Sequence, residues 1–338
     1  MSHRTHMLPV VLVAISTSLL CLETGRGDDT GRGAEPASRP MSKIPLPAPK
    51  LPDGITVQWG VHYREGNPNW NMNLAMPRDL TGKLRPAIVI IHGGGWIEGD
   101  ASSFSDLNVV AQQPAHIVNF AKAGFVAVAI NYRLSGEAPF PAAVEDCKCA
   151  VRWLRAHAKD YHIDADHIGA WGNSAGGHLA LLLGMVGRQV GMEGEGPYQD
   201  QSSMAQAVVS DAGPVDLDFF YRFIKDKRIV VQFLAGPKET FSDRLKKASP
   251  ITYVSSCVPP LMILQGCADP YVSPEETDRF VAKLQKVGAP DVTYLRLGKM
   301  GHCPHSLVRV PYLQEAVVDF FTRTLTSPQG GANESAKK

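Results

Sequence analysis

The chain has 338 residues, with 34 Lys and Arg against 33 Asp and Glu, for a formal net charge of +1. A near-neutral composition without long blocks of like charge argues against nucleic acid or an anionic membrane as the main partner. The length could hold two average domains, but single α/β domains of about 250 residues are common, so the chain can bury a sizeable core in one domain.

The N-terminus predicts a signal peptide. His3 and Arg4 precede an apolar run over residues 8–22, which is too short to span a bilayer comfortably. We therefore expect residues 1–25 to be a signal peptide and the protein to be secreted or periplasmic, with no membrane span. An ordinary buried helix is the alternative. Lipoprotein anchoring at Cys21 is a minor alternative, because Leu20 stands before it at a position where a small residue is needed.

Two segments have compositions that cannot bury enough apolar surface to fold. Residues 26–50 and 327–338 are rich in small, polar and charged residues, so we expect a disordered linker and a disordered tail. The folded body is expected to run over residues 51–326.

Short apolar runs alternate with helical patterns through this body. An antiparallel pair is predicted within residues 54–77, and a helix over residues 141–158. The runs that read as buried strands are residues 87–93, 125–132, 167–172, 206–213, 260–266 and 292–298. This order predicts an α/β fold with a mostly parallel sheet and helices on both faces. Residues 214–249 break the alternation and are expected to form a small cap insertion that roofs a site.

The motif GNSAGG, residues 172–177, lies between a predicted strand and a predicted helix. A serine on such a sharp turn needs small neighbours two positions away, because the backbone there is strained and closely packed. Gly172 and Gly176 meet that requirement. Ser174 is therefore a candidate nucleophile at the start of a helix, where backbone N–H groups point outward.

The motif HGGGW, residues 92–96, follows the strand over residues 87–93. Consecutive glycines let backbone N–H groups turn toward an anion, as in the oxyanion hole of acyl transfer. A flexible turn or a phosphate loop is the alternative, but no Lys followed by Ser or Thr comes after the glycines.

Two further polar residues follow predicted strands. Asp269 comes after residues 260–266, and His302 comes after residues 292–298, which is the order of acid and base expected after a serine nucleophile on this type of sheet. Singly, each would read as a turn or surface residue. His302, Cys303 and His305 also suggest a metal cluster, but their spacing does not suit a tetrahedral zinc site, and we expect no metal and no cofactor.

Five stretches resemble successive motifs of one superfamily: HGGGWIEGD, NYRLSGEAPFPAAVEDCKCAVRWLR, GNSAGGHLA, LQGCADPYV and GKMGH. Together they resemble the α/β-hydrolase superfamily. Within it, they resemble the carboxylesterases related to hormone-sensitive lipase and the bacterial feruloyl-esterase-like (BD-FAE) group. The resemblance covers about residues 54–326 and implies an α/β-hydrolase fold.

The resemblance also implies roles for individual residues. Ser174 would be the nucleophile, Asp269 the acid and His302 the base, with an oxyanion hole formed by the backbone N–H groups of Gly94, Gly95 and Ala175. His92 would brace the loop rather than react, and His305 would lie on the surface beyond it. Structural roles tying a helix to a loop are expected for Asp146, Arg133 and Arg155.

This sequence departs from the group at Asn173, where many relatives carry His, Asp or Glu, and at Cys303, where a small or aromatic residue is usual. Trp96, Asn173 and Tyr271 are candidate residues of the substrate pocket. Cys267 and Cys303 flank the catalytic loops, so a disulfide between them would tie the loops together.

The predicted function is that of a serine carboxylic-ester hydrolase. Short-acyl or aryl esters such as acetyl or feruloyl esters are the expected substrates, either as small molecules or linked to polysaccharide. The alternatives are an amidase or formamidase on the same site, a metal-dependent hydrolase, and a catalytically idle binding protein on a hydrolase scaffold.

Overall fold

The computed structural model describes residues 51–82, 84–105, 116–304 and 311–326. The signal peptide, the linker, the C-terminal tail and His305 of the sequence predictions lie outside the described residues.

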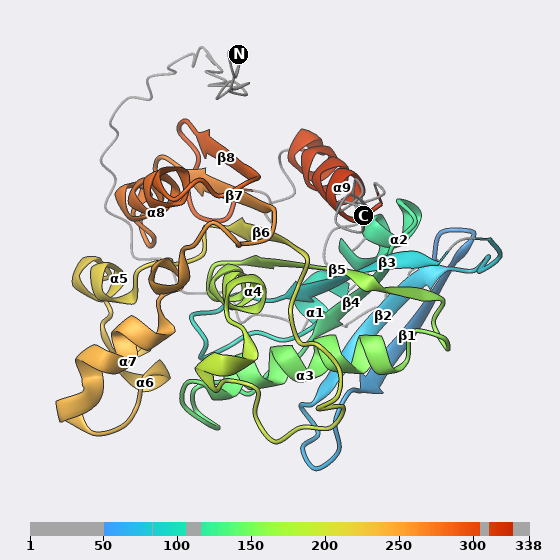
Figure 1. Cartoon of the computed structure of the whole chain (residues 1–338), viewed down its shortest axis with the longest axis horizontal. Coiled ribbons are helices and arrows are strands. Elements are labelled where there is room, and N and C mark those ends of the chain that lie inside the picture. Colours follow the sequence, from blue (N-terminus) through green and yellow to red (C-terminus); the bar gives the residue numbers. More distant parts are fainter. Residues whose placement is uncertain (1–50, 83, 106–115, 305–310, 327–338) are drawn as a thin grey trace, which may run out of the picture.

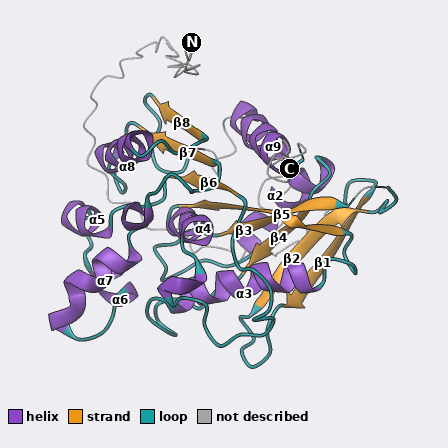
Figure 2. Ribbon diagram, viewed as in Figure 1, coloured by secondary structure: helices purple, strands orange, loops and turns teal. Residues whose placement is uncertain are grey.

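One eight-stranded sheet runs through the molecule in the order β1-β2-β4-β3-β5-β6-β7-β8. The strands are β1 (Ile55–His62), β2 (Asn71–Pro77), β3 (Arg85–Ile91), β4 (Val126–Ile130), β5 (Ile163–Asn173), β6 (Ala207–Asp211), β7 (Leu261–Gly266) and β8 (Val292–Leu297). β2 is antiparallel to both β1 and β4, and all the other pairs are parallel. The predicted α/β architecture is therefore confirmed (Figures 1 and 2).

Helices cover both faces of the sheet. They are α1 (Ser102–Ser105), α2 (His116–Lys122), α3 (Ala142–Ala156), α4 (Ala175–Met185), α5 (Leu217–Phe223), α6 (Arg228–Phe233), α7 (Phe241–Ala248), α8 (Pro274–Lys286) and α9 (Pro311–Leu325), with single 3₁₀ turns at Arg188–Val190, Lys238–Thr240 and Pro250–Tyr253. The core on one face holds buried side chains of α3, α4 and α8, and the core on the other holds those of α2 and α9. The sheet is thus the middle of three layers.

The buried strands show why this arrangement follows from the sequence. In β3, Val89 and Ile91 belong to the core beneath α3 and α4, whereas Ile88 and Ile90 belong to the core beneath α2 and α9. Successive side chains of a strand point to opposite faces, so a strand covered on both sides needs a continuous apolar run. β-branched residues suit such a strand because they pack well on a pleated surface.

The parallel register brings the carboxyl ends of the central strands together. Ile91 of β3 pairs with Gly172 of β5, and Asn173 of β5 pairs with Asp211 of β6. Gly266 of β7 pairs with Leu297 of β8. The loops that leave β3, β5, β7 and β8 therefore start from one edge of the sheet, where ligands bind in open α/β folds.

The range predicted as a cap insertion, residues 214–249, connects β6 to β7 and contains the short helices α5, α6 and α7. In Figure 1 these helices gather in one corner, below α8 and away from β1 and β2. Two contacts join α6 to the loop that follows β4: the Phe140 N–H donates to the Phe233 carbonyl oxygen at 2.7 Å, and the two rings lie 5.6 Å apart.

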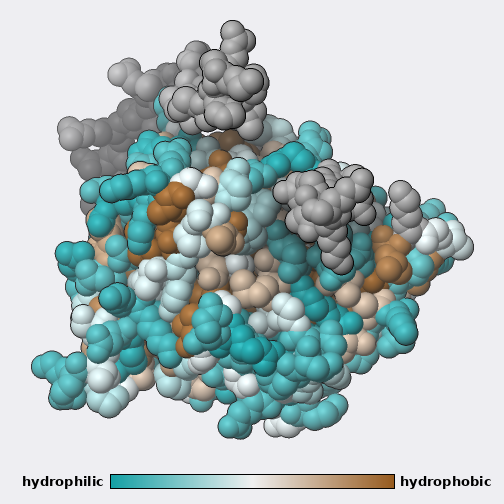
Figure 3. Space-filling model, viewed as in Figure 1, coloured by the Kyte–Doolittle hydropathy of each residue, from teal (hydrophilic) through white to brown (hydrophobic). Residues whose placement is uncertain are grey.

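The surface seen in Figure 3 is mostly hydrophilic, with apolar residues in separate patches. The large apolar side chains that are exposed are Trp59, Leu84, Ile97, Phe223, Val231, Tyr271, Val287 and Tyr312. Within the part of the chain that the structure describes, no helix combines the length and the apolar character needed to cross a bilayer.

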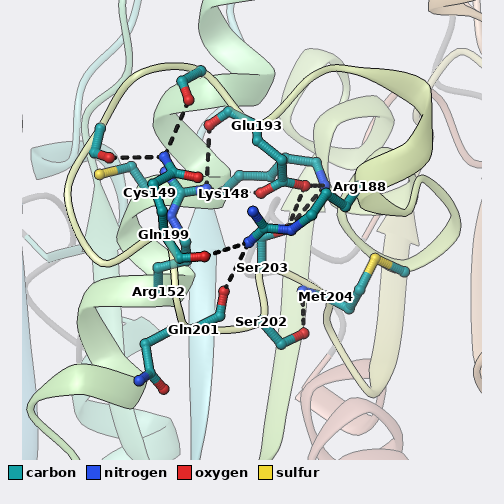
Figure 4. A network of polar contacts seen from close by, with 12 residues as sticks. Lys148, Cys149, Arg152, Arg188, Glu193, Gln199, Gln201, Ser202, Ser203 and Met204 are labelled. Carbon is teal, nitrogen blue, oxygen red and sulfur yellow. Dashed lines mark hydrogen bonds and ion pairs between the residues drawn. The ribbon is translucent and has the colours of Figure 1, made fainter.

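A buried cluster of charges fastens the long connection after α4 to helix α3 (Figure 4). The Lys148 ammonium, fully buried on α3, donates to the Val186 carbonyl oxygen at 2.8 Å, to Glu193 Oε1 at 2.7 Å and to Ser203 Oγ at 3.0 Å. Arg152, one turn further along α3, donates to Glu193 Oε2 at 2.8 Å. Glu193 thus balances two buried cations, and burial nevertheless lowers the pKa of Lys148.

We expect the substitution Glu193→Gln to lower the free energy of unfolding by about 3 kcal/mol, because it leaves Lys148 and Arg152 buried without a counter-charge. Denaturant unfolding monitored by circular dichroism measures this. The matched control is Asp218→Asn, which removes the exposed ion pair with Arg222 and should change stability by less than about 0.5 kcal/mol. Equal effects of the two substitutions would contradict the stabilising role of the buried cluster.

Candidate active site

Ser174 lies on a strained turn between β5 and α4. Its backbone has φ 51° and ψ −122°, outside the regions that L-residues usually adopt. The Ser174 N–H donates to the Asp211 carbonyl oxygen at 2.8 Å, and the Ser174 carbonyl accepts from His178 N–H at 3.1 Å. A Cβ at Gly176 would collide with the carbonyl oxygen of Ile91 in β3, so only glycine permits the close contact between α4 and β3.

Asp269 and His302 lie side by side at the ends of β7 and β8. His302 Nδ1 is 2.7 Å from Asp269 Oδ2, while the other carboxylate oxygen, Oδ1, accepts from the N–H groups of Tyr271 at 2.8 Å and Val272 at 3.0 Å. The Asp269 side chain is fully buried and the His302 side chain is 21% exposed. A proton on Nδ1 suits this contact and leaves Nε2 free to accept a proton.

The loop of His302 meets the Ser174 turn at the end of β6. The Asp211 carbonyl oxygen accepts from Ser174 N–H at 2.8 Å, and the Cys303 thiol points to the same oxygen at 3.8 Å. The backbone turn of Ser174 and the residue after His302 therefore converge on one atom. The loop that carries His302 therefore lies beside the turn that carries Ser174, and Asp269 contacts His302 from the end of β7.

The HGGGW loop after β3 packs directly against the Ser174 turn. A Cβ at Gly93 would lie 3.0 Å from the Asn173 carbonyl oxygen and 3.2 Å from Ser174 Cβ. Gly94 has φ +96°, and a Cβ there would strike the Glu98 carbonyl oxygen, so the loop depends on glycine at this position.

Of the predicted oxyanion donors, Ala175 directly follows the nucleophile, and Gly94 and Gly95 follow Gly93, which packs against Ser174. Among the described residues, no carbonyl oxygen accepts from the N–H groups of Gly94, Gly95 or Ala175. Ala175 is the first residue of α4, where N–H groups have no partner within the helix. These N–H groups are therefore available to an anion, and the positive end of the helix dipole favours one at this place.

His92 supports the HGGGW loop through contacts with Gly93 and Tyr132. Its ring stacks on Tyr132 with centroids 4.2 Å apart, its Nδ1 is 2.8 Å from the Gly93 carbonyl oxygen, and the Tyr132 hydroxyl donates to the His92 carbonyl at 3.0 Å. Burial lowers the pKa of His92 to about 4. A neutral, buried ring held in this way supports the loop and does not exchange protons with substrate near neutral pH.

The three candidate pocket residues lie in different environments. Trp96 is 1% exposed and stacks on Phe233 of α6 at 4.3 Å, so its indole belongs to the core rather than to an open pocket wall. Its backbone has a φ of 61°, in the left-handed region. Tyr271 is 56% exposed, and its ring meets the His302 ring edge to face at 5.2 Å. Asn173 is half-buried beside the glycine loop.

Ile229 of α6 is a site residue that the sequence did not single out. Its Cγ2 lies 3.2 Å from the position of a Cβ on Gly95, and the Cγ1 of Ile97, which is 37% exposed, lies 3.9 Å from the same position. Apolar side chains therefore border the oxyanion loop. An isoleucine inside an apolar helical stretch carries no signal that distinguishes a pocket residue from a core residue.

Neither Cys267 nor Cys303 is part of a disulfide in the structure, in contrast to the pairing that the sequence suggests. The Cys303 thiol is buried and directed at the Asp211 carbonyl, whereas Cys267 Sγ accepts from the Arg296 guanidinium of β8 at 3.2 Å. The two sulfur atoms point to different partners. Within the described residues, no three His, Cys, Asp or Glu side chains are grouped as ligands for a metal ion.

The residues expected to tie helix to loop do so. Buried Asp146 of α3 accepts from the Arg133 N–H at 2.8 Å and from its guanidinium at 2.8 Å. Arg155, at the end of α3, donates to the Ala165 carbonyl at 3.0 Å and to Gln206 Oε1 at 2.8 Å. These contacts hold α3 against the loops at both of its ends.

Two esterases of one bacterium are similar in sequence to the chain. Esterase LipC of Mycobacterium tuberculosis is 30% identical over 234 residues, which are 67% of this chain and 54% of that protein. Esterase LipQ of the same organism is 29% identical over 249 residues, which are 71% of this chain and 55% of that protein. The chain thus spans about half the length of the curated relatives it matches.

Solved structures resemble the chain over most of its length. A truncated carbohydrate esterase from gut microbiota is 28% identical, with a TM-score of 0.69, over 80% of this chain and 97% of that one. The esterase Est2 of Thermogutta terrifontis with bound butyrate is 26% identical, with a TM-score of 0.63, over 82% and 97%. Est2 phosphonylated by sarin is 25% identical, with a TM-score of 0.62, over 83% and 99%.

The sequence profile of the BD-FAE family matches residues 72–284. This match covers more than half of the chain, and the solved structures superimpose on most of it with TM-scores of 0.69 and 0.63. The resemblance noted from the motifs is thereby confirmed: the chain belongs to the BD-FAE family and has the α/β-hydrolase fold.

Proposed function

We propose that the protein is a serine carboxylic-ester hydrolase that works through an acyl-enzyme, with Ser174 as nucleophile, His302 as base and Asp269 as acid. The observation that carries the proposal is the 2.7 Å contact between His302 Nδ1 and Asp269 Oδ2 on a loop that meets the strained turn of Ser174. A hydroxyl becomes an effective nucleophile only when such a base accepts its proton.

In the acylation step, His302 Nε2 removes the proton of Ser174 as its Oγ attacks the ester carbonyl carbon. Asp269 keeps the imidazole in the Nδ1–H tautomer and stabilises its protonated form. The tetrahedral intermediate places a negative oxygen toward the N–H groups of Gly94, Gly95 and Ala175. Donors already in position for such an oxygen each contribute about 3 kcal/mol to lowering the barrier.

Collapse of the intermediate releases the alcohol, which takes the proton from His302. Water then enters, gives a proton to His302 and attacks the acyl-enzyme, and the same oxyanion donors serve the second intermediate. When the second intermediate collapses, His302 returns this proton to Ser174 Oγ, the carboxylic acid leaves and the Ser174 hydroxyl is restored.

We propose short-acyl or aryl esters, such as acetyl or feruloyl esters, as substrates, either small or linked to polysaccharide. Ile97 and Ile229 beside the oxyanion loop suit a small apolar acyl group. The butyrate bound to Est2 is consistent with a short acyl group. The name of the gut carbohydrate esterase is consistent with a carbohydrate as the alcohol part of the ester.

The substitution Ser174→Ala should abolish hydrolysis of p-nitrophenyl acetate and labelling by a fluorophosphonate probe, because both require the serine oxygen. Turnover by the variant should be lower than that of the wild type by about 10³-fold or more. The control is Ser256→Ala, which removes an exposed hydroxyl and should leave both signals at the wild-type level. Turnover by Ser174→Ala equal to that of the wild type would disprove the nucleophile, and faster cleavage of p-nitroacetanilide than of the ester would favour an amidase.

Tyr271 should contact the alcohol part of the substrate, because its exposed ring adjoins His302, which protonates the leaving oxygen. Replacing it in Tyr271→Ala should lower kcat/KM about fivefold for acetylated xylooligosaccharides, since stacking on an aromatic ring contributes about 1 kcal/mol. Tyr271→Phe should retain wild-type activity.

Methyl acetate is the matched substrate for Tyr271, since it carries the same acyl group without a ring on the alcohol. Its hydrolysis, followed by proton release, should not change in Tyr271→Ala. An equal loss with both acetates would instead assign Tyr271 to the support of His302.

A further inference from the structure

A buried amide holds the carboxylate of Asp269 from the side of strand β7. Gln265 is fully buried in the apolar run of this strand. Its Nε2 donates to Asp269 Oδ2 at 3.1 Å and to the Val272 carbonyl oxygen at 3.2 Å. A polar side chain in the interior of a sheet is costly unless its hydrogen bonds are made, and here the bonds lead to the candidate catalytic acid.

The other end of the same amide is held by helix α8. The Thr277 hydroxyl, which is 1% exposed, donates to Gln265 Oε1 at 3.0 Å. A glutamine amide has nearly the same shape when it is turned by 180°, and the turned form would present its oxygen to the Asp269 carboxylate. The Asp269 carboxylate and the Val272 carbonyl oxygen can only accept, so they require the orientation in which the N–H groups face them, and the Thr277 hydroxyl donates to the remaining oxygen.

Both carboxylate oxygens of Asp269 accept hydrogen bonds, and these bonds fix the orientation of the carboxylate toward His302. Oδ1 is fixed by the N–H groups of Tyr271 and Val272, and Oδ2 is shared by Gln265 Nε2 at 3.1 Å and His302 Nδ1 at 2.7 Å. Gln265 thus binds the same oxygen atom that receives the imidazole. A chain of hydrogen bonds runs from α8 through β7 to the base: Thr277, Gln265, Asp269, His302.

We propose that Gln265, anchored by the hydroxyl of Thr277, is a positioning residue for the reaction. It keeps Asp269 Oδ2 directed at His302, and it opposes rotation of the carboxylate away from the imidazole. The inference rests on the proposed esterase function and extends it beyond the three reacting residues. Neither Gln265 nor Thr277 is exposed, so neither can touch the substrate, and their effect should fall on kcat and not on KM.

The main test uses Gln265→Met, which keeps the length of the side chain and removes its donors and acceptor. We expect kcat for p-nitrophenyl acetate, counted per active site by fluorophosphonate titration, to fall about 10-fold, because a hydrogen bond to a charged group is lost. KM should stay within twofold of the wild-type value.

Thr277 offers a matched pair of variants. Thr277→Val keeps the shape and removes the hydroxyl, so it should lower kcat about fivefold, whereas Thr277→Ser keeps the hydroxyl and should restore kcat to within twofold of the wild type. The double variant Gln265→Met with Thr277→Val should be no slower than Gln265→Met alone, because both substitutions break one chain of bonds.

The positioning role is separable from a purely structural role and from the esterase activity itself. If the variants lower the melting temperature or the titrated fraction of active sites but leave kcat per active site within twofold, the proposal is wrong. Equal kcat values for Thr277→Val and Thr277→Ser would also overturn it. Should Gln265→Met fail to fold, the Thr277 pair decides alone. Absence of Ser174-dependent turnover in the wild-type protein would remove the proposed function, and the positioning role with it.

Discussion

The backbone of Ser174, with φ 51° and ψ −122°, is a conformation that the chain adopts only because its surroundings impose it. Three contacts do so. The Asp211 carbonyl at the end of β6 accepts its N–H, Gly176 places α4 directly against the Ile91 carbonyl of β3, and Gly93 lies against Ser174 Cβ. Each contact comes from a different strand or loop, so the turn depends on the register of three adjacent parallel strands.

The same constraint locates the other groups of the site. Since β3, β5 and β6 are held in register, the glycine loop after β3 and the first N–H of α4 lie beside one serine. The Asp269 and His302 loops reach the same place because β7 and β8 continue the parallel order on the far side of β6. Two sets of contacts stabilise this arrangement further. Trp96 stacks on Phe233 and so joins the glycine loop to α6, and Gln265 bonds to Asp269 and Thr277 and so joins the acid to α8.

Much of the fold and of the site could be predicted because the relevant signals are local. Continuous β-branched runs such as that of β3 predict strands buried on both faces, and their alternation with helical patterns predicts a parallel sheet. The order of Ser174, Asp269 and His302, each directly after a strand, predicts that they meet at one edge. In the structure, His302 Nδ1 lies 2.7 Å from Asp269 Oδ2.

Sequence reasoning was weaker wherever the direction of a side chain mattered. The sequence predicts Trp96 in a pocket, but its ring is buried against Phe233, and no local pattern indicates which of these two places a tryptophan takes. Cys267 and Cys303 were considered as a pair because they flank the two catalytic loops, yet their sulfur atoms face Arg296 and Asp211. Gln265 did carry a signal, since a single amide in the apolar run of β7 must find buried partners, but the sequence could not name them.

By itself, the sequence determined the α/β class and the chemical types available at the strand ends, because these follow from hydrophobic periodicity and from the position of polar residues after each strand. The hydrolase family came from the resemblance of five motifs to those of the BD-FAE group. Only the tertiary structure decided which buried groups meet. Several such contacts join residues that belong to different elements or loops: Gln265 with Thr277 and Asp269, Trp96 with Phe233, and Glu193 with Lys148 and Arg152. Such pairs are set by strand register and helix packing, which depend on the whole core and not on any local stretch.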